Sequence, residues 1–126
     1  TKRMEKSLSG ECSMKKLEGS INIFHSHWEE LNKHRKRSGT HFGAYSIAPY
    51  YFFFGVHYAA FAIELLPEAQ RSEHRERLLE VILKTQEPDG TWNDMPQASV
   101  SAYATAMVVL CLLGPEMPRP PNLKDM

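Results

Sequence analysis

The stretch Leu78–Asp94, LLEVILKTQEPDGTWND, decides how the rest of the chain is organised. It begins as an amphipathic helix, because its apolar residues recur every three or four positions, and it then enters the turn Pro88-Asp89-Gly90. Proline presets φ in such a turn, aspartate bonds its own backbone two residues later, and glycine accepts a positive φ. A second apolar segment follows at once, so the stretch predicts a helical hairpin.

The same periodicity predicts four helices, at residues 14–35, 46–66, 67–86 and 98–113. The first and third are amphipathic and should bury one side each. The first carries a single apolar stripe, made by Leu17, Ile21, Phe24, Trp28 and Leu31. The second and fourth are apolar all round, so other helices should surround them. The order outer, inner, outer, inner predicts an all-α fold.

An internal repeat supports this order. Lys33-x5-Gly39-Thr40-His41 is matched by Lys84-x5-Gly90-Thr91-Trp92, which lies 51 positions later, and Leu66-Pro67-Glu68 is matched 48 positions later by Gly114-Pro115-Glu116. A period near 50 residues is typical of stacked helical hairpins. We therefore expect a flexible segment at 1–13, a repeat region at 14–116 divided into hairpins of about 14–66 and 67–114, and a Pro-rich tail at 117–126. Prolines stand where a third outer helix would begin, so we expect the C-terminal end of an array from a longer protein.

The spacing of one set of residues resembles the QW-type repeat of terpene cyclases and prenyltransferase-like α/α-toroid proteins: Leu79, Leu83, Gln86, Asp89, Gly90 and Trp92. Tyr103-Ala104-Thr105-Ala106-Met107 resembles a helix in the last repeats of squalene-cyclase-like toroids. The resemblance implies that Gln86 ties down a neighbouring inner helix while its aliphatic part lies on Trp92. It gives Gln86, Asp89, Gly90 and Trp92 structural roles. An ordinary helix–turn–helix with a tryptophan is the alternative.

The resemblance also implies that the inner helices line an apolar cavity that binds an isoprenoid or another apolar ligand. The residues that would face this ligand are Tyr50, Tyr51, His57, Ser101 and Tyr103. Aromatic rings suit a prenyl chain or its cation. The alternative for each residue is core packing, with its hydroxyl or imidazole group satisfied locally.

The catalytic motifs of the resembled families are missing, so the sequence leaves enzyme activity open and the catalytic residues unknown. No DxDD cluster occurs, and Asp89 and Asp94 are expected to cap backbone groups in the turn. Ala104 stands where the zinc-binding His of the protein prenyltransferase type would be. The second hypothesis is accordingly a non-catalytic helical-repeat scaffold that binds a protein partner. Further toroid repeats or self-association would cover its inner helices.

Charge and composition favour neither nucleic acid nor a membrane as a partner. The chain has 15 Lys and Arg, 15 Asp and Glu and 42% apolar residues, as in soluble globular proteins. The run Lys33–Arg37 could form a nuclear address or a phosphate-binding patch, but hydrated cations that complement a helix C-terminus are the favoured interpretation. Pro49–Leu66 is near the minimum length of a membrane span, and its His57 and Glu64 favour a buried helix instead.

Neither a metal site nor a disulfide framework is predicted. The histidines that invite a metal proposal, His25, His27, His34 and His41, lack the spacing of a known zinc motif. No cofactor is expected. Cys12 and Cys111 cannot define a disulfide framework, and Cys111 should be a buried thiol. The cellular compartment stays open.

Overall fold

Four α-helices in two layers make up the fold of the computed structural model, which describes residues 13–118 except 40 and 42. They are α2 (Met14–His34), α3 (Tyr51–Leu65), α4 (Glu68–Lys84) and α5 (Ser101–Leu113), and the short 3-10 turns η1 (Ala98–Val100) and η2 (Gly114–Glu116) flank α5. No strand occurs among these residues, so the all-α prediction is confirmed. Cys12 and most of the expected terminal segments, 1–12 and 119–126, lie outside the described residues.

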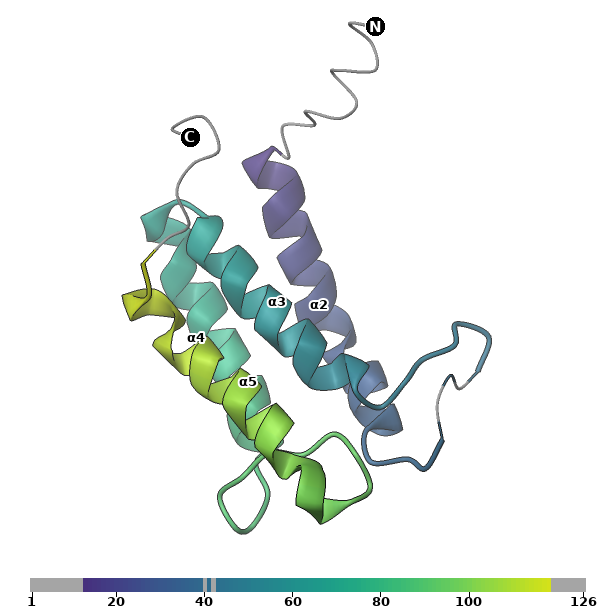
Figure 1. Cartoon of the computed structure of the whole chain (residues 1–126). Coiled ribbons are helices and arrows are strands. Elements are labelled where there is room, and N and C mark those ends of the chain that lie inside the picture. The colour runs from purple at the N-terminus through teal and green to yellow at the C-terminus, as the bar shows by residue number, and fades with distance from the viewer. Residues whose placement is uncertain (1–12, 40, 42, 119–126) are drawn as a thin grey trace, which may run out of the picture.

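The two layers hold the helices in the predicted order. Helices α3 and α5 lie side by side and run in the same direction, while α2 and α4 run the opposite way behind them (Figure 1). Helix α3 is central, because it packs against each of the other three helices. Helix α5 packs mainly against α3.

The core forms where α3 meets its neighbours. Phe52, Phe53 and Val56 of α3 are completely buried. They share one cluster with residues from the other helices: Ile21 of α2, Leu78 and Ile82 of α4, and Val108 of α5. Helix α2 approaches closely at Gly55, where an added Cβ would lie 3.4 Å from the Phe24 ring. Burial of large apolar side chains stabilises such a core by about 1.5–3 kcal/mol each.

The four helices do not surround the inner helices completely, so the cover predicted for them is incomplete within the described part of the chain. One stripe of α3 stays exposed, and it consists of Tyr51, Phe54, Tyr58, Phe61 and Leu65. These residues recur every three or four positions, so they share one side of the helix. Helices α2, α4 and α5 cover the other sides. The second predicted inner helix, α5, also exposes most of its apolar residues.

Seven of the eight helix boundaries lie within three residues of the prediction, but α3 begins five residues later than expected. Residues 43–46 form a turn in which Ser46 has φ 51°, so the chain does not enter the helix there. Pro49 precedes the helix, and its carbonyl accepts the N–H of Phe52 at 3.3 Å. At the start of α2, the Ser13 hydroxyl accepts the Lys16 N–H at 3.3 Å as an N-cap.

The two hairpins share local features at the positions that the repeat matches. Gly39 and Gly90 both adopt left-handed conformations, with φ 91° and 86°. Pro67 is the N-cap of α4, whereas its equivalent Pro115 lies inside η2, which follows α5 directly, so the two copies differ at this second match. The shared local conformation is therefore confined to the two glycines.

The basic run Lys33–Arg37 joins the two hairpins. Arg35 Nη1 donates to Glu87 Oε1 and to the Asn93 carbonyl, both at 3.0 Å, and its guanidinium lies 5.7 Å from the centre of the Phe52 ring. Lys36 pairs with the same Glu87 carboxylate. These bonds lower the pKa of Glu87, with Lys36 as the largest cause. The run does end α2 as predicted, but Arg35 is largely buried rather than hydrated, because it binds the second hairpin.

Candidate functional site

The turn after α4 is built as its sequence predicts. Asp89 Oδ1 accepts the backbone N–H of Thr91 at 3.0 Å and its hydroxyl at 2.7 Å, and these bonds lower the pKa of Asp89. Gly90 supplies the left-handed conformation. Trp92 is only 8% exposed and donates its indole N–H to the Ile82 carbonyl at 2.8 Å. The indole therefore satisfies a carbonyl of the last turn of α4.

Thr105, rather than Gln86, ties this turn to an inner helix. The Gln86 amide donates to the Gly90 carbonyl at 2.9 Å, inside its own turn, and its side chain is exposed. The Thr105 hydroxyl of α5 accepts the Trp92 N–H at 3.1 Å and donates to the Trp92 carbonyl at 3.3 Å. Two hydrogen bonds through one hydroxyl fix the backbone of the turn against α5.

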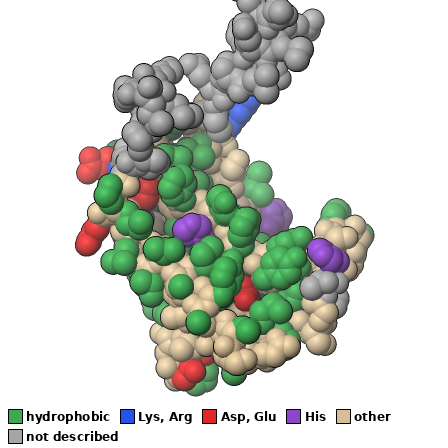
Figure 2. All heavy atoms as spheres, viewed as in Figure 1, with side chains coloured by type: hydrophobic (Ala, Val, Ile, Leu, Met, Phe, Trp, Pro, Cys, Tyr) green, Lys and Arg blue, Asp and Glu red, His purple; other side chains and the backbone are tan. Residues whose placement is uncertain are grey.

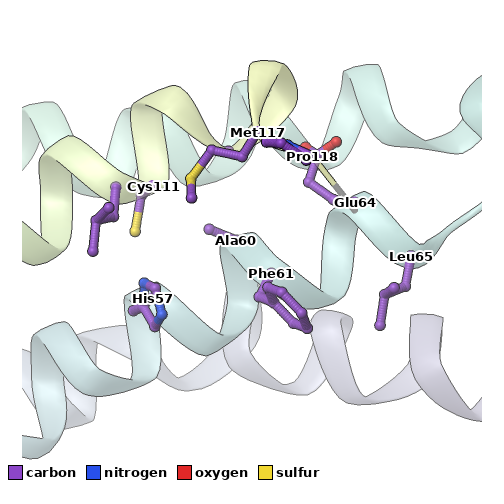
Figure 3. A pocket seen from close by; sticks show the side chains of 10 residues that line it. His57, Ala60, Phe61, Glu64, Leu65, Cys111, Met117 and Pro118 are labelled. Atoms are coloured by element: carbon purple, nitrogen blue, oxygen red, sulfur yellow. The ribbon is translucent and has the colours of Figure 1, made fainter. Parts of the chain in front are cut away.

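A cavity of about 230 Å³ lies between α3 and α5, toward their C-terminal ends (Figure 3). Its walls are mainly apolar: Ala60, Phe61 and Leu65 from α3, Leu110 and Cys111 from α5, and Met117 and Pro118 beyond η2. The volume is somewhat smaller than that of a typical ligand pocket, about 300–1,000 Å³. The cavity could therefore hold part of an apolar ligand, with the rest lying along the exposed helix surface.

Among the described residues, the polar side chains of Glu64 and His57 line this cavity, and they differ in their hydrogen bonding. Arg75 of α4 holds Glu64 in a bidentate pair, with N–O distances of 2.8 and 2.6 Å. The Nδ1 atom of His57 is buried and has no hydrogen-bond partner among the described residues. Figure 3 shows His57 directed toward Cys111 across the cavity. A ligand hydroxyl or carboxylate in the cavity would supply the missing partner.

Cys111 is a poor nucleophile in this setting. It is a buried, free thiol, and burial raises its pKa to about 12. The thiolate is the reactive form of cysteine, and it is scarcely populated at neutral pH with such a pKa. Cys111 therefore contributes packing to the cavity wall, and the prediction of a buried thiol is confirmed.

The cavity opens within a wider exposed surface, which we name the apolar face. It is formed by eight side chains, each 37–56% exposed: Tyr51, Phe54, Tyr58, Phe61 and Leu65 of α3, Tyr103 and Leu110 of α5, and Met117. Figure 2 shows hydrophobic side chains gathered over α3 and α5. The Phe54 and Tyr58 rings are in contact, with centroids 4.6 Å apart.

The five predicted ligand-facing residues do not form one site. His57 lines the cavity, whereas Tyr51 and Tyr103 lie on the apolar face outside it. Tyr50 packs edge-on against Tyr51 at the start of α3, with centroids 5.0 Å apart. Ser101 borders a separate hollow beside the Pro88–Thr91 turn. The candidates other than His57 lie at the N-terminal ends of the inner helices, and the cavity lies toward the opposite ends.

Sequence reasoning missed a buried carboxyl group. Asp94 is 1% exposed, and neither of its oxygens accepts a hydrogen bond from another described residue, so it does not cap the turn as expected. Burial raises the pKa of Asp94, and its own backbone N–H and the charge of Arg35 offset this in part. Burial also raises the pKa of nearby Tyr103, with smaller contributions from Asp94 and Tyr58.

A buried histidine pair between α2 and α4 was missed as well. The rings of His25 and His74 stack with centroids 5.6 Å apart and an interplanar angle of 7°. Burial, followed by the positive charge of Arg77 and by the His74 ring, lowers the pKa of His25 to about 4. The only available signal was that His25 continues the apolar spacing of α2, four residues after Ile21.

Neither metal ligation nor membrane insertion has strong support. Within residues 13–118, omitting 40 and 42, no three His, Cys, Asp or Glu side chains gather as metal ligands would. One helical segment in this part of the chain, Ala98–Glu116 of 19 residues, is long and apolar enough to cross a membrane by length and composition alone. Helix α3, which forms most of the segment Pro49–Leu66 that the sequence suggested as a possible span, is shorter, at 15 residues.

No family model, no curated protein and no solved structure matches this chain.

Proposed function

We propose that this chain contributes two hairpin repeats to an α/α-toroid-like protein and binds an apolar, isoprenoid-like ligand between its inner helices. The order of layers and the parallel inner helices support the toroid part of this proposal. The repeated left-handed glycines, Gly39 and Gly90, support it as well.

The observation that carries the ligand proposal is the cavity between α3 and α5 together with His57. An apolar ligand gains about 25 cal/mol for each Å² of apolar surface that leaves water. The walls of the cavity supply such surface, and Nδ1 of His57 supplies one polar contact without a partner in the described chain. This combination fits a long apolar chain with one polar end, such as an isoprenoid alcohol.

Farnesol binding to two matched variants tests the proposal. Leu110 and Val109 are neighbours on α5 and are similarly exposed, at 40% and 45%, but only Leu110 lines the cavity. Leu110→Trp fills the cavity and should weaken farnesol binding at least about tenfold, which is a change of about 1.4 kcal/mol. Val109→Trp adds the same ring outside the cavity and should leave the affinity unchanged. Equilibrium dialysis with labelled farnesol measures both, and thermal melts verify folding.

A protein-binding scaffold is the second candidate, and the width of the apolar face favours it. The face extends beyond the cavity to Tyr51 and Phe54, near the start of α3, which a small ligand in the cavity would leave exposed. If wild-type protein binds farnesol no better than a Kd of about 1 mM, or if both tryptophan variants bind equally, the ligand proposal fails and the scaffold remains.

A further inference from the structure

We propose that the apolar face is covered by a second copy of this chain, in a two-fold symmetric dimer that places α3 of each protomer against α5 of its partner. The proposal rests on the exposed surface of α3 and α5 and does not require the ligand proposed above.

The first argument is the area of the face. Its eight side chains are 37–56% exposed, and five of them are aromatic. Since an aromatic side chain presents about 150–250 Å², the face exposes about 700 Å². The largest apolar patch of a typical monomer is about 300–600 Å², whereas each partner of a standard interface buries about 800 Å². The face therefore approaches the size that a stable dimer requires.

The second argument is charge. The segment Ala98–Leu113 contains no Asp, Glu, Lys or Arg, and the only such residue in α3 is Glu64. Glu64 borders the cavity and is held by Arg75 of the same chain. A partner with a complementary charge pattern would find no charges to recognise on these helices. Two copies of the face, in contrast, meet without repulsion between like charges.

The third argument is shape. Helix α3 presents large side chains at Phe54, Tyr58 and Phe61, whereas α5 exposes the small Ala102 and Ala106 next to Tyr103 of the apolar face. A two-fold axis brings α3 of one copy against α5 of the other twice, so large side chains meet small ones in both places. The equivalent positions of the two repeats support this fit, because Phe54 and Tyr58 lie 48 residues before Ala102 and Ala106. One chain thus carries both halves of a self-complementary interface.

Such a dimer would also close the cavity. Phe61, Leu65 and Leu110 line the cavity and also belong to the apolar face. A partner helix over these residues would exclude water from the cavity, so the two copies would enclose a larger apolar chamber.

The oligomeric state of the full chain and of two matched variants tests the dimer. The double variant Phe54→Glu/Tyr58→Glu adds two charges to the apolar face, at residues that do not line the cavity. The control Ile23→Glu/Leu83→Glu adds two charges to the outer layer, at residues that are 63% and 58% exposed. Sedimentation equilibrium over a concentration series should give wild type and control a mass of twice 14.4 kDa. The face variant should dissociate at least about 100-fold more readily, because burying unpaired charges is costly.

Circular dichroism identifies a variant that has unfolded, and the single Tyr58→Glu substitution then replaces the double variant. The dimer proposal is overturned by a wild-type monomer at every concentration, by a folded face variant that dimerises as tightly as wild type, or by a control that dissociates equally. A monomer that still binds farnesol would overturn the dimer and leave the ligand proposal intact. A dimer that does not bind farnesol would support the dimer proposal and overturn the ligand proposal.

Discussion

At the scale of single residues, the burial of the Asp94 carboxyl group is expected to lower the free energy of unfolding. Its carboxyl group is fully buried without a hydrogen bond from another described residue, and burial raises its pKa. The neighbouring backbone is held firmly, since Arg35 binds the Asn93 carbonyl and Lys36 donates its N–H to the Asp94 carbonyl at 2.9 Å. The bonds around Asp94 therefore keep in place a carboxylate that would prefer water.

Asp94→Asn should stabilise the protein at high pH. Above the raised pKa the folded protein must hold a buried charge, and the amide removes that charge while keeping the shape. As the pH falls through the folded pKa toward the unfolded one, wild-type Asp94 takes up its proton and the advantage of the amide disappears. We expect an increase of about 1 kcal/mol or more in the free energy of unfolding at pH 8. Urea melts at pH 8 and pH 4 measure it, and a gain that is equal at both values contradicts the prediction.

The sequence could not predict the burial of Asp94. A turn rich in Asp and Pro favours backbone capping, and Asp89 does cap Thr91 as expected. Whether a polar side chain three residues beyond the turn faces water depends on Arg35 and Tyr103, which come from other elements. The same holds for Arg35, because its partners Glu87 and Asn93 lie more than fifty residues away. Local patterns carry no information about such contacts.

At the scale of elements, the α4–α5 hairpin separates what sequence could and could not predict. Helical periodicity placed α4 within two residues at each end, and turn chemistry placed Gly90 in its left-handed conformation. The resemblance implied that Gln86 holds the turn against the inner helix. In the structure the Thr105 hydroxyl forms this hydrogen bond, and Gln86 bonds within its own turn. Both are polar residues at plausible spacing, and only the packing of α5 on the turn decides between them.

Three substitutions rank the contributions to this hairpin. Trp92→Ala should destabilise the fold by about 3 kcal/mol, because it leaves a cavity between α4 and α5. Thr105→Val keeps the shape but leaves the Trp92 N–H without an acceptor, which costs about 1–3 kcal/mol. Gln86→Ala removes an exposed bond and should cost less than about 0.5 kcal/mol. Urea denaturation measures all three, and a change below about 0.5 kcal/mol for Trp92→Ala would show that the turn is not the centre of the hairpin.

At the scale of the whole molecule, the inner layer, α3 and α5, exposes apolar side chains, whereas the outer layer, α2 and α4, buries a histidine pair. The sequence predicted both layers correctly, because amphipathic and wholly apolar helices alternate along the chain. It also predicted that the inner helices would need further repeats or self-association to cover them, but not which residues would form the apolar face, because an apolar residue gives the same sequence pattern whether its own chain or another molecule covers it. In the outer layer, His25 stacks on His74 at the α2–α4 contact, and the lowered pKa of His25 predicts that acid destabilises the fold.

The pH dependence of stability should reveal this histidine pair. The pKa of His25 is about 4 in the folded protein against 6.5 ordinarily, so the unfolded chain binds more protons between these values. Stability is therefore lost as the pH falls from 6.5 to 4, by about 3 kcal/mol in total, and His25 causes no further loss below pH 4. His25→Gln should flatten this slope, whereas the matched substitution His27→Gln at an exposed site of the same helix should preserve it. Asp94 acts in the opposite sense, so the difference between His25→Gln and wild type isolates the histidine. Equal slopes in urea melts of all three proteins would mean that His25 accepts a proton in the fold, and that the α2–α4 contact opens to water without cost.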